Sequence, residues 1–111
     1  MKIERRIVGT AQVCEPQDAL VDDGAGEFAA VLRECVNGHN PRVVVAMESV
    51  PYMDSTALET LVQVSNEMVA RSQQLKLAGV TPTCREIMEL TGLSGRFQFF
   101  EDVDAAVRSF L

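Results

Sequence analysis

The sequence has no tryptophan, one tyrosine and only two lysines among its 111 residues. The shortage of lysine leaves no basic cluster, and with a net charge of −6 this argues against nucleic acid or an anionic membrane as the main partner. No apolar run approaches the length of a membrane span, and the start MKIERRIVG lacks the apolar core of a signal peptide. We therefore expect a cytoplasmic protein with no direct membrane insertion.

Histidine and cysteine are also scarce. His39 is the only histidine, and no partner stands at a spacing suited to a metal site or a catalytic triad. Cys14, Cys35 and Cys84 are odd in number and far apart, which fits neither a disulfide framework nor a zinc knuckle, so we interpret them as small buried apolar residues. Common catalytic motifs are missing as well. The sequence therefore predicts no catalytic residue, metal or cofactor.

The hydrophobic pattern is that of one folded domain over residues 1–111, since 47% of the residues are hydrophobic. Apolar runs typical of strands alternate with runs of helical spacing in the order β-β-α-β-α-β-α-β-α. This order predicts an α/β fold with a mixed, mostly parallel sheet and about four helices. The expected strands lie near residues 3–7, 11–13, 43–47, 75–80 and 97–100.

Acidic residues gather at the predicted helix starts, namely Asp22 with Asp23, Asp54, and Glu101 with Asp102. The helix dipole and the unpaired amides of the first turn explain these acids without catalysis, and we expect Asp22 and Asp23 to cap the first helix. Gly24 and Gly26 resemble part of a nucleotide-binding loop. No third glycine or following lysine completes a phosphate motif, so we interpret the pair as a flexible helix entrance.

The stretch 42–62, RVVVAMESVPYMDSTALETLV, organises the rest of the chain. Its apolar, β-branched run at residues 43–47 is typical of a parallel strand that is covered on both faces. From Leu58 onward the apolar residues recur at the spacing of one helical face: Leu58, Leu61, Val62, Met68 and Val69. Asp54 or Ser55 therefore stands at the helix N-cap, and taken alone the pattern indicates a good cap.

The run VVVAMESVPYMDSTALETLV also resembles the signature of the STAS domain, the fold of bacterial anti-sigma factor antagonists, in which an apolar strand leads to Asp-Ser-Ser/Thr-Gly-Leu at a helix start. The stretch LKLAGVTPTCREIMELTGLSGRFQFFEDVDAAVRSF follows the family's pattern too, and the N-terminal third matches in outline. The resemblance implies a noncatalytic module that binds an anti-sigma factor or a switch-type serine kinase. It implies phosphorylation at Thr56, with Ser55 as the alternative, and Asp54 matches the family's aspartate.

The same resemblance implies a partner-binding surface at this helix start, formed by Asp54, Ser55, Thr56 and Ala57. Tyr52 and Met53 would make the adjoining contact surface; the alternatives are that Met53 belongs to the core and that Tyr52 packs at the end of the strand. Two positions depart from the family's pattern, because Ala57 replaces the usual glycine and Ala46 replaces an aspartate that members use around the phosphorylation site. These departures bear on the kinase reaction more than on the fold.

Two other functions compete with this interpretation. STAS proteins also serve as accessory subunits of ABC-type lipid transporters, where the partner would be the transporter's ATPase. A response-regulator receiver with Asp54 as phosphoacceptor is disfavoured, because its chemistry needs a pair of acids after the first strand to hold Mg²⁺ and a lysine after the last strand. Here only Glu15 is near the first place, and no lysine follows Lys76.

Overall fold

Five strands form one mixed sheet in the computed structural model, which describes residues 2–111. The predicted element order and the mostly parallel sheet are confirmed. The elements are β1 (Ile3–Val8), β2 (Ala11–Pro16), α1 (Asp22–Val36), β3 (Val43–Ala46), α2 (Ser55–Ala70), β4 (Lys76–Ala78), α3 (Pro82–Leu90), the 3-10 turn η1 (Ser94–Arg96), β5 (Gln98–Phe100) and α4 (Val103–Arg108).

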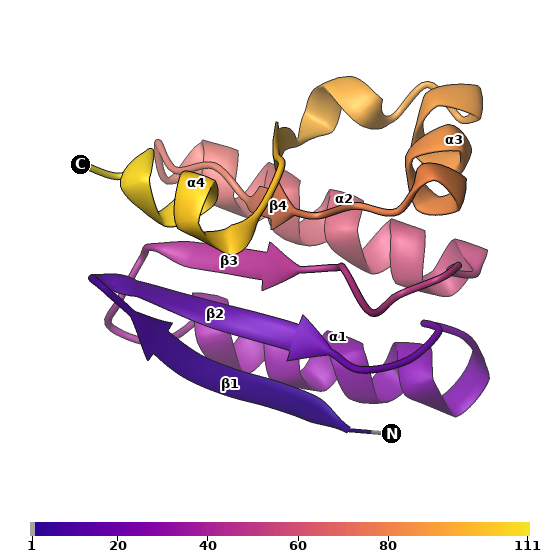
Figure 1. Ribbon diagram of the computed structural model, residues 1–111, viewed down its shortest axis with the longest axis horizontal. Helices are drawn as coiled ribbons and strands as arrows, with labels where there is room; N and C mark the ends of the chain where they lie inside the picture. Colours follow the sequence, from indigo (N-terminus) through magenta and orange to yellow (C-terminus); the bar gives the residue numbers. More distant parts are fainter. Residues whose placement is uncertain (1) are drawn as a thin grey trace.

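The spatial order of the strands, β1-β2-β3-β4-β5, is the same as their order in the sequence. β1 and β2 form an antiparallel hairpin, and each later strand adds in parallel to the one before it. Because every crossover moves in the same direction and such crossovers are right-handed, the connecting helices lie on one face. Of the helices in residues 2–111, α4 alone, which follows the last strand, covers the other face (Figure 1). The strand order thus decides the placement of the helices, which the sequence left open.

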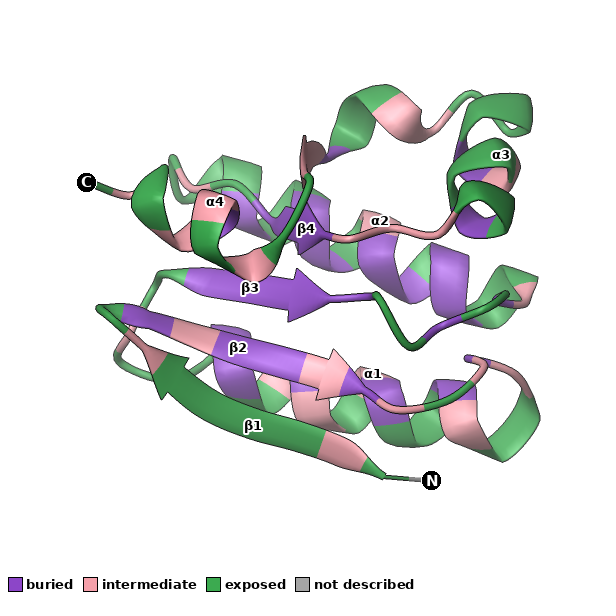
Figure 2. Cartoon of the chain, viewed as in Figure 1, coloured by how far each residue is buried: buried purple, intermediate pink, exposed green. Residues whose placement is uncertain are grey.

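The sheet separates two hydrophobic clusters. The first lies against α1, α2 and α3 and contains large side chains such as Phe28, Leu61 and Met88. The second lies against α4 and is made of small residues: Ala11, Val13, Val44, Ala46, Ala78 and Ala106. β3 contributes to both clusters and is buried along its whole length (Figure 2), as the valine run predicts. The central strand of the sheet is therefore shielded from solvent on both faces.

One prediction about α2 is wrong. The sequence pattern places Val69 on the buried face of this helix, but its side chain is 57% exposed, while Val64 and Ser65 are buried. The buried stripe is rotated because η1 packs against α2, and the Ser65 hydroxyl donates a hydrogen bond to the Arg96 carbonyl in that turn. Tertiary packing has overridden the apolar pattern.

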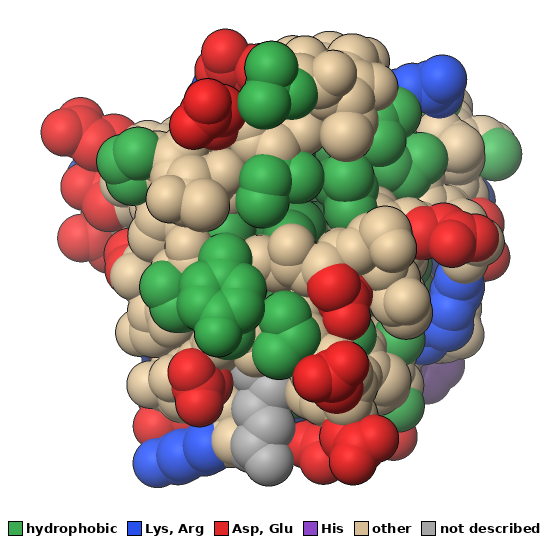
Figure 3. Space-filling model, turned by 90° about the vertical axis from the view of Figure 1, so that its right-hand side faces the viewer, with side chains coloured by type: hydrophobic (Ala, Val, Ile, Leu, Met, Phe, Trp, Pro, Cys, Tyr) green, Lys and Arg blue, Asp and Glu red, His purple; other side chains and the backbone are tan. Residues whose placement is uncertain are grey.

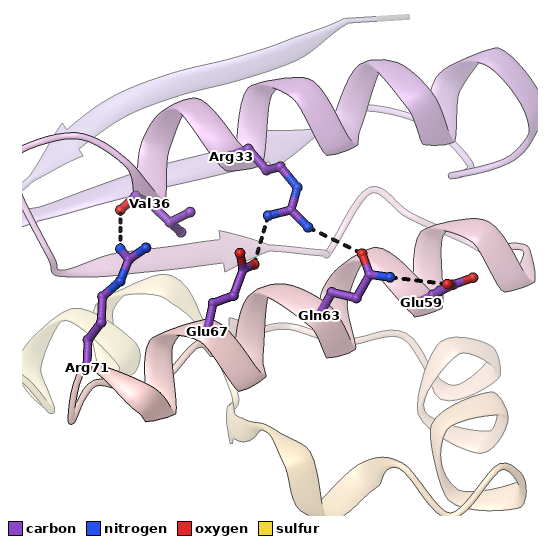
Figure 4. Close-up of polar contacts among 6 residues, drawn as sticks. All are labelled: Arg33, Val36, Glu59, Gln63, Glu67 and Arg71. Carbon is purple, nitrogen blue, oxygen red and sulfur yellow. Dashed lines mark hydrogen bonds and ion pairs between the residues drawn. The ribbon is translucent and has the colours of Figure 1, made fainter.

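Helices α1 and α2 lie side by side and follow neighbouring parallel strands, so both begin at the same end of the molecule (Figure 4). Arg33 of α1 donates hydrogen bonds to Glu67 at 2.7 Å and to Gln63 at 3.3 Å. Where the two helices end, Arg71 donates a hydrogen bond to the Val36 carbonyl at 3.3 Å. Such surface contacts each stabilise little, but they fix the alignment of the two helices.

The remaining structural expectations concern cysteine, histidine and membrane helices. The three cysteines are buried and free, as predicted, and His39 is exposed in the loop before β3. Within residues 2–111, none of the helices has both the length and the apolar character needed to cross a membrane.

Candidate functional site

Asp54 holds the starts of two helices together. It is the N-cap of α2, where its Oδ1 atom accepts a hydrogen bond from the Ala57 N–H at 3.0 Å. Its Oδ2 atom accepts another from the N–H of Asp22, the first residue of α1, at 2.9 Å. These backbone donors, that of Ala57 first, lower the pKa of the Asp54 carboxyl, so it is charged at neutral pH. Both carboxylate oxygens are therefore engaged in fixing the helix starts.

The predicted cap of α1 is wrong. Val21 occupies the N-cap without a side-chain hydrogen bond, and Asp22 lies inside the first turn with φ 51°. The acceptor that a cap residue normally supplies comes instead from Asp54, which no local pattern reveals. The prediction of a flexible entrance is also wrong, because Gly24 and Gly26 lie inside α1.

The connector between β3 and α2 is fixed at two points. The Val50 carbonyl accepts a hydrogen bond from the Thr81 hydroxyl at 2.8 Å, which ties the connector to the start of α3. Nearer α2, the Leu20 N–H donates to the Tyr52 carbonyl at 3.1 Å, and the Asp54 N–H donates to the Leu20 carbonyl at 2.9 Å. The side chain of Tyr52 is 50% exposed on this fixed backbone.

Ser55 and Thr56 are the first two residues of α2, and both are exposed. Neither hydroxyl forms a hydrogen bond with another residue of the described chain. A helix N-terminus favours negative charge through its dipole and its free amides. A phosphoryl group on either hydroxyl can therefore be accommodated without unfolding the helix.

The predicted partner-binding residues divide into two groups. Tyr52, Ser55 and Thr56 are exposed, with Asp54 partly so, whereas Met53 and Ala57 are buried in the first cluster. The side chains of these two residues therefore pack in the core beneath the surface, and a role in binding stays a prediction.

Figure 3 shows this end of the molecule, where hydrophobic side chains run across the face and Asp and Glu side chains lie around them. Sequence reasoning did not assign Asp22 and Asp23 to this site, although both are exposed where α1 begins beside α2. The one signal was topological, since helices that follow adjacent parallel strands begin at the same edge of a sheet. The site is thus more acidic than the motif alone indicated.

Ala46 lies on the other side of the sheet from α2. Its side chain is fully buried in the cluster that packs against α4. Glu48, two residues later, lies against Gly79 at the end of β4. No group of three or more His, Cys, Asp or Glu residues within the described chain is arranged to hold a metal ion.

Comparison with known proteins gives a family and a fold. The family model of the STAS domain matches residues 3–106. Among solved structures, a candidate anti-sigma factor antagonist from Thermotoga maritima is similar with a TM-score of 0.86 at 18% identity, over 96% of this chain and 92% of that one. An anti-sigma factor antagonist from Mycobacterium paratuberculosis gives a TM-score of 0.81 at 18% identity, over 97% and 92%.

A transport protein is similar as well. A sulfate transporter family protein from Wolinella succinogenes gives a TM-score of 0.77 at 17% identity, over 94% of this chain and 88% of that one. The search of curated proteins gave no match. At these identities the structural likeness establishes the fold.

Proposed function

Because this chain belongs to the STAS domain family, we propose that it is a noncatalytic signalling module that binds an anti-sigma factor or a switch-type serine kinase and is released by phosphorylation at Thr56 or Ser55. The observation that carries the proposal is the pair of exposed, unpaired hydroxyls at the start of α2, beside a carboxylate that is fully used as a cap. A kinase could therefore reach the Ser55 and Thr56 hydroxyls without any rearrangement of the fold.

The electrostatics of the helix start supply the release step. A phosphoryl group adds about −1.5 to −2 charge. On Thr56 this charge would join the exposed acids Asp22 and Asp23 and the charged Asp54. A partner whose docking surface is apolar or acidic would then be repelled, and about 1.4 kcal/mol of repulsion lowers affinity tenfold.

Tyr52 is the residue best placed to anchor the unphosphorylated complex. Aromatic side chains on a fixed backbone often dominate binding energy, and the Tyr52 ring projects from a connector held by hydrogen bonds on both sides. Pro51 is exposed beside it and extends the apolar contact.

The test combines phosphorylation with partner binding. The chain is incubated with a candidate switch kinase and MgATP, and intact mass with peptide mapping locates the phosphate. We expect it on Thr56 or Ser55, lost in the corresponding alanine variants, and we expect Thr56→Glu to weaken partner binding at least about tenfold. Thr10→Glu is the control, since it adds the same charge at the exposed β1–β2 turn. No phosphate on either residue, together with unchanged binding by Thr56→Glu, would rule the switch out.

A second candidate belongs to transport. The family resemblance implies an accessory subunit of an ABC-type lipid transporter, with the same helix start docking on the ATPase. The similar fold of a sulfate transporter family protein supports a role in transport in general. Neighbouring genes separate the two: a sigma factor and a switch kinase favour the first, and a permease and an ATPase favour the second. Co-purification with the neighbouring ATPase would then support transport directly.

A further inference from the structure

A cavity of about 320 Å³ lies at the C-terminal end of α2, remote from Ser55 and Thr56 at its start. It is lined chiefly by Arg42, Ser72, Gln73, Gln74, Lys76 and Phe110. Its volume falls within the range of pockets that bind small molecules. With about 1.5 Å of rise per residue, the 16-residue helix α2 separates the cavity from Thr56 by about 20 Å.

The cavity is formed where two parallel strands begin. Arg42 directly precedes β3 and Lys76 is the first residue of β4, and these strands are neighbours, so their amino ends meet at one edge of the sheet (Figure 1). Residues 72–74 connect α2 to β4, and Phe110 follows α4. Three segments of the chain thus form the cavity, and two of them each bring a cation to it.

Lys76 is buried without a counter-charge. Its side chain is 8% exposed, and its Nζ atom donates a hydrogen bond to Gln98 at 2.9 Å and lies 5.1 Å and 4.5 Å from the ring centres of Phe100 and Phe110. No Asp or Glu within residues 2–111 forms an ion pair with it. Burial lowers the pKa of the ammonium. Lysine is almost never buried unpaired, and an ammonium has three N–H donors, of which the amide of Gln98 takes one.

Arg42 adds a second unopposed charge. Its side chain is exposed, and its guanidinium makes no hydrogen bond or ion pair with any other described residue. None of the described residues that line the cavity is acidic. The chain as a whole has a net charge of −6, whereas the lining of this cavity carries two positive charges and no negative one.

We propose that this cavity binds a small molecule through an oxyanion group, a phosphate or a carboxylate, held between Arg42 and Lys76. The guanidinium fork matches two oxygens of such a group, and the ammonium has free donors for a third contact. The Ser72 hydroxyl and the amides of Gln73 and Gln74 supply neutral donors at the rim, while the Phe110 ring provides an apolar wall for the carrier of the oxyanion.

The binding test uses inorganic phosphate, phenyl phosphate and benzoate, each titrated at constant ionic strength into the ¹⁵N-labelled chain. We expect saturable shifts of the amide resonances of residues 42, 72–74, 76 and 110 at millimolar ligand or below. Tighter binding of phenyl phosphate than of phosphate identifies an organic phosphate as the natural class. Tighter binding of benzoate identifies an organic carboxylate, and equal binding of all three identifies the bare oxyanion. The absence of saturable shifts with every probe overturns the proposal.

Three variants locate the binding site. Lys76→Met keeps a long apolar stem and removes the charge, and Arg42→Gln changes an exposed side chain, so each should weaken binding at least about tenfold. Lys2→Gln removes the same charge from an exposed residue ahead of β1 and should alter binding less than about twofold. Equal weakening by all three variants, or none by Arg42→Gln, overturns the proposal even if Lys76→Met fails to fold. Because Thr56 takes no part, the result is independent of the proposed switch.

Discussion

The Oδ2 atom of Asp54 accepts a hydrogen bond from the N–H of Asp22 at 2.9 Å, across 32 positions of the chain. The same carboxylate accepts from Ala57, so one side chain caps both α1 and α2. Any change at the start of α2 that displaces Asp54 also removes the acceptor at the start of α1. The two helix starts are therefore mechanically coupled.

Asp54→Ala should lower the melting temperature by several degrees, because two helix starts lose an acceptor at once. Asp102 provides the matched comparison, since it caps only α4 through the Ala105 N–H at 2.8 Å. We expect Asp102→Ala to cost about 1 kcal/mol and to have the smaller effect. Thermal unfolding followed by circular dichroism measures both variants, and equal shifts would contradict the double cap.

The stabilisation from Asp54 should depend on pH. Its pKa is lower in the folded chain than its usual value of 3.8, chiefly because of the Ala57 and Asp22 amides, so the unfolded state binds more protons in acid. The contribution is complete above the unfolded-state pKa and is lost as the pH falls through the folded-state pKa. Asp54→Asn should therefore lower stability at neutral pH by more than it does near pH 3. A difference that does not shrink in acid would show that the charge is irrelevant.

Tyr52 and Met53 are neighbours with opposite exposure, which predicts opposite consequences of truncation. Met53→Ala should destabilise the fold by about 2 to 5 kcal/mol, because this side chain is 6% exposed and packs in the first cluster. Tyr52→Ala should cost less than about 1 kcal/mol while weakening partner binding. Urea unfolding and a binding titration on both variants check this, and a large stability loss for Tyr52→Ala would indicate a packing role.

Gly79 should be intolerant of a side chain for two separable reasons. Its φ is +64°, and an added Cβ would clash with the Cγ atom of Glu48. Gly92 has a φ of +74° with open space around it, so Gly92→Ala isolates the backbone cost of about 1 to 2 kcal/mol. We expect Gly79→Ala to lower the free energy of unfolding by more than Gly92→Ala does. Adding Glu48→Ala to the Gly79→Ala variant should recover only the difference between the two. Equal costs for the two glycines, measured by urea unfolding, would mean that Glu48 moves aside freely.

Strands and helix starts could be predicted from the sequence where their pattern lies in one continuous segment. The valine run predicted a strand buried on both faces, and Asp102 was correctly expected to begin the last helix. Thr81 and Pro82 occupy the N-cap and first position of α3, a residue pattern typical of a helix start. Yet the Thr81 hydroxyl does not cap its own helix, because it donates to the Val50 carbonyl and fixes the connector instead. A local cap pattern cannot show such a competing partner.

The placement of the candidate site was predictable in part for the same reason. Tyr52, Ser55 and Thr56 could be expected to lie together at the surface because one short segment carries them, and their role in binding stays a prediction. The hydrogen bond from the Asp22 N–H to the Asp54 carboxylate was missed because these two residues are far apart in the sequence. Lys76 is the one charged residue of the predicted strand at residues 75–80, and only the packing of α4 over β4 shows that it is buried.

The strand order β1-β2-β3-β4-β5 also bears on how the chain folds. Each strand pairs only with its neighbours in the sequence, so every pairing closes a loop of modest length and the sheet can grow from one edge. During synthesis the hairpin, α1 and β3 can assemble before the later segments emerge, and α4 covers the second face last. We therefore expect the N-terminal half to acquire protection from amide exchange first in refolding experiments, and the α4 face to follow.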